Sequence, residues 1–338
     1  MKTELPPWLD GPRRLLDEAF AGPRPPHALL LRAAAGLAAE RLGTWIAARV
    51  LCQAGEARPC GRCRACVAVE RGTHPDLIFL SPLEDSKQIR IDEIRDLIAD
   101  FGLKSHQGGY KVAIVHPAEA LNMSAANALL KTLEEPPQNT LLVLVTHRRA
   151  RLPATIVSRC QQLAIAAPTP AAARAWLERE LPGSDSAAAL RFARGAPLRA
   201  AELVAQGFAD LDREMTDAMA ELTRAALDVP AVADRWTRSG KADLPERLLW
   251  LETWVTETII GGMTGGKSAR PGAETGLPAA VETLKIRALY RVLDRLRQMK
   301  ITSLTSLNLT MAVESLLLDL GMALASAPAG QRKQGGRK

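Results

Sequence analysis

Residues 111–147 have the sequence KVAIVHPAEALNMSAANALLKTLEEPPQNTLLVLVTH. Two short apolar runs, at 111–116 and 141–147, enclose a helical pattern that begins at Asn127 and ends at Glu135, before a pair of prolines. Proline cannot continue a helix. Short runs rich in Val, Ile and Leu suit strands that are buried on both faces. A strand, a helix and a second strand in one stretch predict a βαβ unit, and therefore a parallel sheet.

The same alternation extends outward over the first half of the chain. Three further apolar runs, at 27–33, 77–80 and 161–166, predict three more strands. One helix face is predicted by apolar residues at helical spacing, namely Ile91, Ile94, Leu97, Ile98 and Phe101. We therefore expect an α/β domain of the nucleotide-binding type over residues 1–167, with helices on both faces of a parallel sheet.

After Pro168 the strand pattern ends. Residues 169–207 read as short alanine-rich helices, and residues 208–325 as longer amphipathic helices. Three tryptophans at helical positions are predicted to be core residues: Trp236, Trp250 and Trp254. Four apolar residues are predicted to share one face of the last helix: Leu304, Leu307, Met311 and Leu318. The predicted fold class is α/β plus all-α.

Composition excludes several classes of protein. Hydrophobic residues make up 47% of the chain and charged residues 24%, which is ordinary for a globular protein. The net charge is +7, but four of the basic residues lie in the last seven, RKQGGRK, within a tail at 326–338 that we expect to be disordered. The charge is therefore weak evidence for a nucleic-acid surface. We find no signal peptide and no membrane span, so we expect no contact with a membrane. Five cysteines are too few for a disulfide scaffold, and four of them are clustered, which suggests a metal in a reducing compartment and therefore a cytoplasmic protein.

Four of the five cysteines form the pattern C-x7-C-x2-C-x2-C: Cys52, Cys60, Cys63 and Cys66. Four thiolates in fifteen residues can surround one tetrahedral Zn²⁺ with no open position, which makes a structural site. An iron–sulfur cluster of the ferredoxin type would need a further cysteine soon after Cys66, and residues 67–70 contain none. Free thiols are the other alternative, but this spacing is rare without a metal.

Residues 261–268, GGMTGGKS, match the P-loop pattern G-x-x-x-x-G-K-[ST]. A working P-loop lies between a strand and a helix, whose N-terminus helps to hold the phosphates. Here the preceding segment is more helical than strand-like, and several prolines and glycines follow. We therefore expect a loop, and an active ATPase that uses Lys267 is the alternative.

In an ATPase domain of this type the P-loop follows the first strand, and at that place this sequence departs from the P-loop pattern. The positions concerned are Ala33, Gly36, Ala38, Ala39 and Glu40. Alanine replaces the lysine that binds phosphate, and Glu40 replaces the hydroxyl residue that binds Mg²⁺. The strand at 111–116 likewise ends in His-Pro where two acids are expected. This domain has the predicted strands and helices of an ATPase, but it lacks the residues that bind phosphate and Mg²⁺.

Three features together resemble one known family. NALLKTLEEPP at 127–137, LPATIVSRC at 152–160 and the four-cysteine insertion are similar to the ATPase domains of bacterial clamp loaders, which belong to the AAA+ class. The degenerate P-loop resembles the ATP-silent members of this family more than the ATP-hydrolysing gamma/tau subunits. The resemblance covers about residues 8–325.

The resemblance implies roles for individual residues. Ser158, Arg159 and Cys160 match the SRC motif, whose arginine acts in trans as an arginine finger on ATP bound to a neighbouring subunit. Thr146 occupies the sensor 1 position and Arg199 resembles sensor 2. Both are expected to be vestigial, because no ATP is expected to bind to this chain.

The resemblance also implies an architecture and a function. We expect a RecA-like AAA+ domain at 1–167 with a zinc module at 52–66, a small helical lid at 168–207 and a helical collar at 208–325 that oligomerises. The chain would form a hetero-pentamer with delta and gamma/tau subunits, in the cytoplasm at the replisome and nucleoid. That complex loads the beta sliding clamp onto primed DNA. The chain itself would be an accessory subunit of a DNA-directed DNA polymerase, a nucleotidyltransferase at the level of the complex, with no activity of its own. A stand-alone zinc-dependent nucleic-acid-binding protein is a further alternative.

Overall fold

The computed structural model describes residues 4–55, 58–83, 86, 88–184, 186–238, 244–263, 283–302 and 309–324. The chain divides into two units, residues 1–203 and 204–338, and each is described by itself. The predicted tail at 326–338 and most of the P-loop pattern at 261–268 lie outside the described residues. Among the described helices, none combines the length and apolar character needed to cross a membrane.

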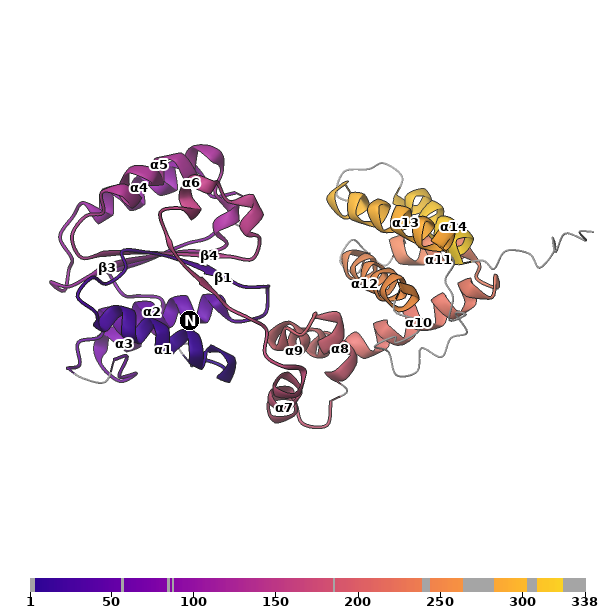
Figure 1. Ribbon diagram of the computed structural model, residues 1–338, viewed down its shortest axis with the longest axis horizontal. Coiled ribbons are helices and arrows are strands. Elements are labelled where there is room, and N and C mark those ends of the chain that lie inside the picture. The colour runs from indigo at the N-terminus through magenta and orange to yellow at the C-terminus, as the bar shows by residue number, and fades with distance from the viewer. Residues whose placement is uncertain are drawn as a thin grey trace, which may run out of the picture. The chain divides into compact units, whose positions relative to one another are not determined.

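The first unit is built on a five-stranded sheet (Figure 1). Every neighbouring pair of strands is parallel. In spatial order the strands are β2 (Leu77–Leu80), β3 (Lys111–Val115), β4 (Thr140–Thr146), β1 (Ala28–Arg32) and β5 (Gln161–Ala164). All five apolar runs are thus confirmed as strands, and the predicted parallel sheet is confirmed.

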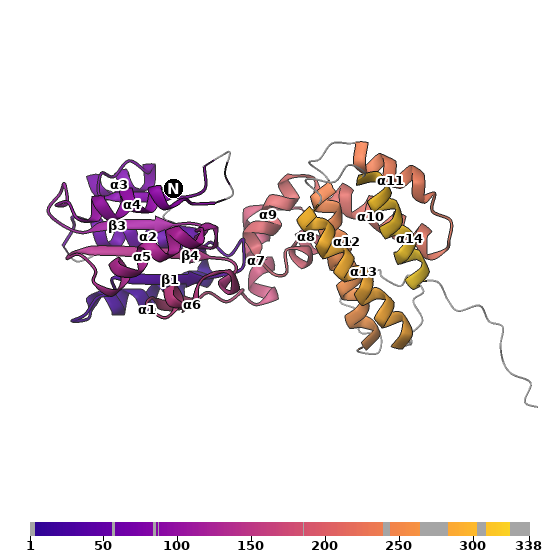
Figure 2. The same cartoon turned by 90° about the horizontal axis from the view of Figure 1, so that it is seen from above.

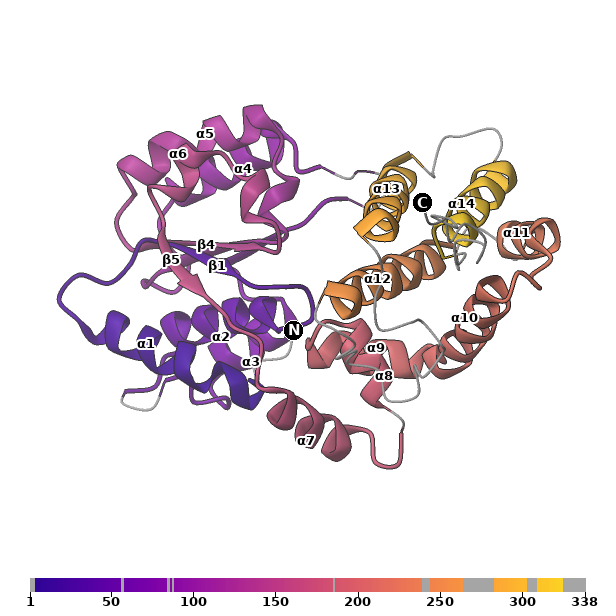
Figure 3. The same ribbon diagram turned by 45° about the vertical axis from the view of Figure 1, so that its right-hand side comes forward.

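Helices cover both faces of this sheet (Figure 3). Successive strand side chains point to opposite faces, so Leu29 and Leu31 join one buried cluster and Leu30 joins the other. One face carries α1 (Asp10–Ala21), α2 (Ala39–Leu51) and α3 (Arg64–Arg71). The other carries α4 (Ile91–Phe101), α5 (Met123–Glu134) and α6 (Ala154–Val157). Short 3₁₀ turns are η1 (Pro7–Leu9), η2 (Ala118–Ala120) and η3 (Arg149–Arg151).

Helix α5 begins four residues earlier than the sequence pattern predicted. The side chain of Asn122 accepts a hydrogen bond from the backbone N–H of Ala125 at 2.8 Å and so caps the helix at that point. A side-chain acceptor at this position satisfies one of the free amides of the first turn. The helix therefore starts at Met123 rather than at Asn127.

The strand order indicates which edge of the sheet is the usual ligand position. Strand β1 is followed by α2 on one face of the sheet, and β4 is followed by α6 on the other, yet β1 and β4 are neighbours. In open parallel sheets, ligands bind at the carboxyl ends of the strands where the chain switches faces in this way. Residues that follow β1 and β4 therefore occupy the position of a nucleotide site.

The remaining described elements are all helices. The first unit also contains α7 (Pro170–Glu180), α8 (Ser186–Phe192) and most of α9 (Pro197–Ala205). The second contains α10 (Phe208–Thr223), α11 (Val229–Arg238), α12 (Leu244–Met263), α13 (Thr283–Thr302) and α14 (Leu309–Leu324) (Figure 2). Helix α12 packs against α13, and α11 packs against α14. The predicted fold class, α/β plus all-α, is confirmed.

The buried faces of the second unit agree only in part with the sequence pattern. Trp236, Trp250 and Trp254 are buried, as predicted. Met311 and Leu318 do not face the core, because they are 62% and 49% exposed, and Leu304 and Leu307 lie outside the described residues. Helix α14 is apolar on more than one side, and it buries a different set: Val313, Leu316, Leu317 and Leu320.

Candidate functional site

The four clustered cysteines come together at the junction of α2 and α3. Their sulfur atoms all lie within 4.8 Å of one another, and those of Cys52 and Cys63 are 3.9 Å apart. Four sulfurs at about 2.3 Å from one Zn²⁺ in a tetrahedron lie roughly 3.8 Å from each other. Among the described residues, this is the one group of side chains whose geometry fits a metal ion. The cluster therefore fits the closed site that the spacing predicted.

Backbone N–H groups donate hydrogen bonds to three of these sulfurs, which favours the thiolate form that binds a cation. The N–H groups of Ala54, Cys63 and Cys66 donate to the sulfurs of Cys52, Cys60 and Cys63, at 3.3–3.4 Å. Burial raises the pKa of Cys63, but backbone hydrogen bonds outweigh it and lower that pKa to about 6. Burial raises the pKa of Cys66 to about 12. A bound dication would deprotonate that thiol as well, since the thiolate is the ligand.

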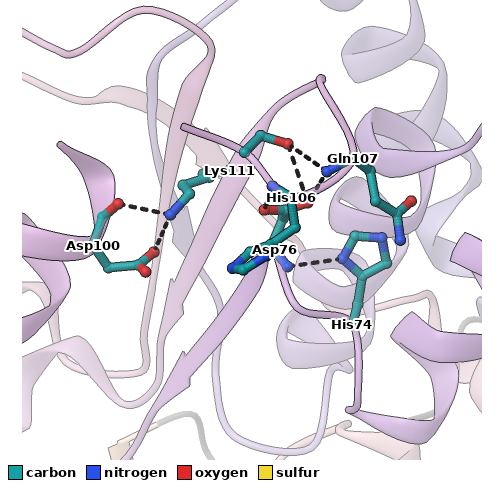
Figure 4. Close-up of polar contacts among 7 residues, drawn as sticks. His74, Asp76, Asp100, His106, Gln107 and Lys111 are labelled. Atoms are coloured by element: carbon teal, nitrogen blue, oxygen red, sulfur yellow. Dashed lines mark hydrogen bonds and ion pairs between the residues drawn. The ribbon is translucent and has the colours of Figure 1, made fainter. Parts of the chain in front are cut away.

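A polar network surrounds Asp76 (Figure 4), and His74, Asp76 and Gln107 of this network line the same cavity as Cys52. Asp76, directly before β2, accepts hydrogen bonds from the backbone N–H groups of His106 and Gln107 at 2.7 and 3.2 Å. His74 is 3% exposed and accepts from the backbone N–H of Asp76, and burial lowers its pKa. The cavity that His74 and Cys52 both line has a volume of about 200 Å³. The hydrogen bonds to Asp76 hold the loop before β3 next to the cavity that Cys52 lines.

The degenerate P-loop is covered by another part of the chain. Gly36 has a positive φ of 81°, and its carbonyl accepts a hydrogen bond from the backbone N–H of Leu198 at 3.2 Å. A Cβ atom at Gly36 would lie 2.6 Å from the Cβ of Arg199. The start of α9 therefore packs directly on the loop, and the structure brings the predicted sensor 2 residue to the predicted loop.

The N-terminal segment closes the loop from a second direction. The indole N–H of Trp8 donates to the carbonyl of Leu37 at 3.0 Å. The same ring contacts Trp176 of α7 edge to face, with centroids 5.3 Å apart. Ala38 adopts a left-handed conformation, with φ of 64°, directly before α2. These contacts hold the loop, the N-terminal segment and helices α7 and α9 together.

The carboxyl ends of β1 and β4 meet as predicted for a parallel sheet. Ala33 donates its backbone N–H to the carbonyl of Thr146 at 3.1 Å. The hydroxyl of Thr146 donates to a carboxylate oxygen of Glu119 at 2.7 Å, and the backbone N–H of His147 donates to the same carboxylate. Thr146, the predicted sensor 1 residue, is 1% exposed, and its hydroxyl is bound by Glu119 of η2.

Two histidines fill the space next to Thr146. Nδ1 of His147 lies 3.1 Å from the carbonyl oxygen of Ala33, which can only accept, so Nδ1 carries a proton. Nε2 of His147 and Nε2 of His116 lie 3.0 Å apart, and one of them donates a hydrogen bond to the other. Burial lowers the pKa of His116, and the neighbouring His147 lowers it further, while Glu40 and Glu119 partly oppose this shift. Where ATPases carry metal-binding acids, this chain carries two histidines joined by a hydrogen bond.

The predicted finger residue lies on the surface between α6 and β5. Arg159 forms an ion pair with Glu134, the last residue of α5, and its Nε donates to Oε1 of that carboxylate at 2.7 Å. Ser158 is exposed and donates its hydroxyl to the carbonyl of Thr155 at 3.1 Å. Cys160 is buried in the core, and burial raises its pKa to about 11. Cys160 thus anchors the motif while Arg159 faces outward.

Sequence reasoning did not assign four of these residues. Glu119, Glu134, His147 and Trp8 all act on a predicted site residue or its loop. One signal was available for His147, because it directly follows β4 beside the end of β1. The P-loop pattern at 261–268 begins in the last residues of helix α12 and does not follow a strand. This agrees with the expectation from sequence that the segment before the pattern is helical.

Comparison with known proteins gives a consistent group of relatives. A family model described as "DNA polymerase III, delta subunit" matches residues 12–169. The DNA polymerase III subunit delta' of Pseudomonas aeruginosa is 39% identical over 233 residues, which cover 68% of this chain and 70% of the relative. The subunit delta' of Escherichia coli is 32% identical over 322 residues, or 92% and 94% of the two chains. The tau subunit of E. coli is 34% identical over 137 residues, which cover 40% of this chain and 21% of tau.

Proposed function

Because this chain belongs to the family of DNA polymerase III delta' subunits, we propose that it is the ATP-silent subunit of the clamp loader that helps to load the beta sliding clamp onto primed DNA. Family membership makes it a clamp-loader subunit and an accessory component of the polymerase complex. It confirms the resemblance that the motifs at 127–137 and 152–160 indicated.

One observation carries the proposal of ATP silence. The start of α9 lies against Gly36, so close that a single Cβ there would overlap Arg199. In a P-loop the backbone amides must be open to the phosphates. Here the carbonyls of Gly36 and Leu37 accept hydrogen bonds from the backbone N–H of Leu198 and the indole N–H of Trp8, so other parts of the chain pack on the loop itself.

Charge supports the same proposal. Glu40 lies in the first turn of α2, where a P-loop protein has the hydroxyl that binds Mg²⁺. A carboxylate at a helix N-terminus already satisfies the positive end of the helix dipole and repels phosphate. His116, at the end of β3, is neutral where an acid would hold the metal. Neither side chain is of the type that a P-loop ATPase has at that position.

We assign to Arg159 the role of a finger for a neighbouring gamma/tau subunit. Its exposed position on a short segment, anchored by buried Cys160, suits a group that must reach another chain. A planar guanidinium stabilises the charge that spreads over the phosphoryl oxygens as the bond breaks. Thr146 and Arg199 remain vestigial sensors in this proposal.

The helical segments after residue 167 form the lid and the collar in this proposal. Residues 168–207 serve as the lid and 208–325 as the collar that joins delta and gamma/tau subunits in a hetero-pentamer. Exposed apolar side chains on one side of α14 support a contact with another subunit: Met311, Leu318 and Met322. We propose that the cysteine cluster holds one structural Zn²⁺, and that the chain has no enzymatic activity of its own.

Titration calorimetry of ATP–Mg²⁺ into the full chain tests ATP silence, with Lys267→Ala as the matched variant. No heat in either protein is expected. Binding that vanishes in Lys267→Ala would make the pattern at 261–268 a real site. Binding that survives in the variant would place nucleotide in the first-unit pocket and overturn the proposal.

A further inference from the structure

The guanidinium of Arg159 is engaged by its own chain. An arginine has five N–H donors. Nε and Nη2 both donate to Oε1 of Glu134. Nη1 donates to the carbonyl of Thr155 at 3.1 Å and to the hydroxyl of Ser158 at 3.5 Å. Few donors are left for a phosphate, and the charge is neutralised by the carboxylate.

The position of Glu134 is unfavourable for the helix that carries it. It is the last residue of α5, where the carbonyl ends of the helix repel a negative charge. The ion pair with Arg159 offsets that repulsion. The two side chains are 51% and 34% exposed, so water can replace either partner when the pair opens. An ion pair this exposed is weak and opens readily.

We propose that Glu134 is a positioning residue that holds Arg159 in the free subunit and gives it up to the γ-phosphate of the neighbouring ATP. The inference rests on the proposed function of Arg159 as a finger. A carboxylate and a phosphate compete for the same donors. Glu134 occupies the Nε and Nη2 donors of Arg159, so a phosphate that binds these donors displaces it.

This exchange lowers the apparent affinity of the neighbouring site for ATP. A ligand that binds only the open form is weakened by the fraction of molecules in which the pair is open. Removing the charge of Glu134 should therefore strengthen ATP use without any change in the nucleotide pocket itself. The effect must pass through Arg159, and that requirement makes it testable.

The test uses the clamp loader assembled from this chain with its delta and gamma/tau partners. The variants are Glu134→Gln, Arg159→Ala and the double substitution. ATPase activity is measured against ATP concentration, with clamp and primed DNA present. We expect Glu134→Gln to lower the half-saturating ATP concentration by about two- to fivefold, the range that weak exposed ion pairs allow. The double variant should match Arg159→Ala.

Glu135→Gln is the matched control, because Glu135 is the adjacent exposed carboxylate of the same motif, and it should behave as wild type. An unchanged or raised half-saturating concentration in Glu134→Gln would overturn the proposal, as would a gain that persists without Arg159. If Arg159→Ala alone had wild-type activity, the finger itself would be wrong. A slow Arg159→Ala beside an unaffected Glu134→Gln would overturn only the role of Glu134.

A second measurement needs no assembly. In arginine side-chain NMR of the isolated full chain, the Nε–H of Arg159 should exchange with water more slowly in the wild type and in Glu135→Gln than in Glu134→Gln. Equal exchange in all three proteins would show that Glu134 does not hold the guanidinium, and would overturn the proposal independently of catalysis.

Discussion

The Cβ position of Gly36 lies 2.6 Å from the Cβ of Arg199, so the loop after β1 and the first turn of α9 are in direct backbone contact. Gly36→Ala should therefore destabilise the first unit in two ways. A side chain at positive φ costs about 1–2 kcal/mol, and overpacking adds about 1–3 kcal/mol. Urea unfolding of the full chain would measure the difference in free energy of unfolding.

Gly72→Ala is a matched control for that experiment. Gly72 also has a positive φ, of 71°, but nothing lies within 4 Å of its Cβ position. It should show only the conformational cost. Equal losses at the two sites would mean that α9 moves away from the loop easily, and the argument for a closed loop would lose its basis.

The cysteine cluster and the five strands could be predicted from the sequence because their determinants are local. Four cysteines in fifteen residues restrict the chain to one cluster, and an apolar run buried on both faces needs no partner to be recognised. The start of α5 was missed because it depends on one cap, Asn122. Glu119 and Thr146 are separated by 27 residues, and only the strand order brings them together.

The buried face of α14 could not be predicted for a different reason. This helix is apolar over most of its circumference, and its polar residues Glu314, Ser315 and Asp319 lie on the same side as Met311 and Leu318, so the spacing of apolar residues alone selected the wrong face. Met311 and Leu318 share a face, as the pattern indicated, but that face is exposed. Packing against α11 and α13 selects another set of residues for the core.

Purified protein should contain about one zinc ion per chain, because four sulfurs within 4.8 Å leave room for one tetrahedral ion. Elemental analysis of chelator-free protein would measure it. Cys63→Ser should lose most of the metal. Cys160→Ala should keep it, since Cys160 lies in the core away from the cluster. Full zinc content in Cys63→Ser would rule out the four-cysteine site.

Stability should fall as the pH decreases through the range where free histidine titrates. Burial lowers the pKa of His116 from 6.5, so the unfolded chain binds more protons than the folded chain between those two pKa values. Protonation therefore favours unfolding, and the stabilisation present at neutral pH is lost in acid. Urea unfolding at about pH 7.5 and pH 5.5 brackets the transition.

His116→Gln should make that pH dependence smaller without abolishing it. Burial also lowers the pKa of His74, which contributes in the same direction from the other end of the sheet. An identical slope in wild type and variant would contradict the buried, neutral state of His116 and the hydrogen bond to His147 that depends on it.

Arg159→Ala should leave assembly of the clamp loader intact and reduce its DNA-stimulated ATPase activity. Arginine fingers contribute about 10³–10⁵-fold at a single nucleotide site. The whole complex should lose less, because only the neighbouring site depends on this chain. Arg159→Lys should not restore the rate, since lysine keeps the charge but lacks the planar fork of donors. Size-exclusion chromatography and steady-state ATPase assays measure the two properties. Wild-type ATPase in Arg159→Ala, or full rescue by lysine, would contradict a finger that acts through guanidinium geometry.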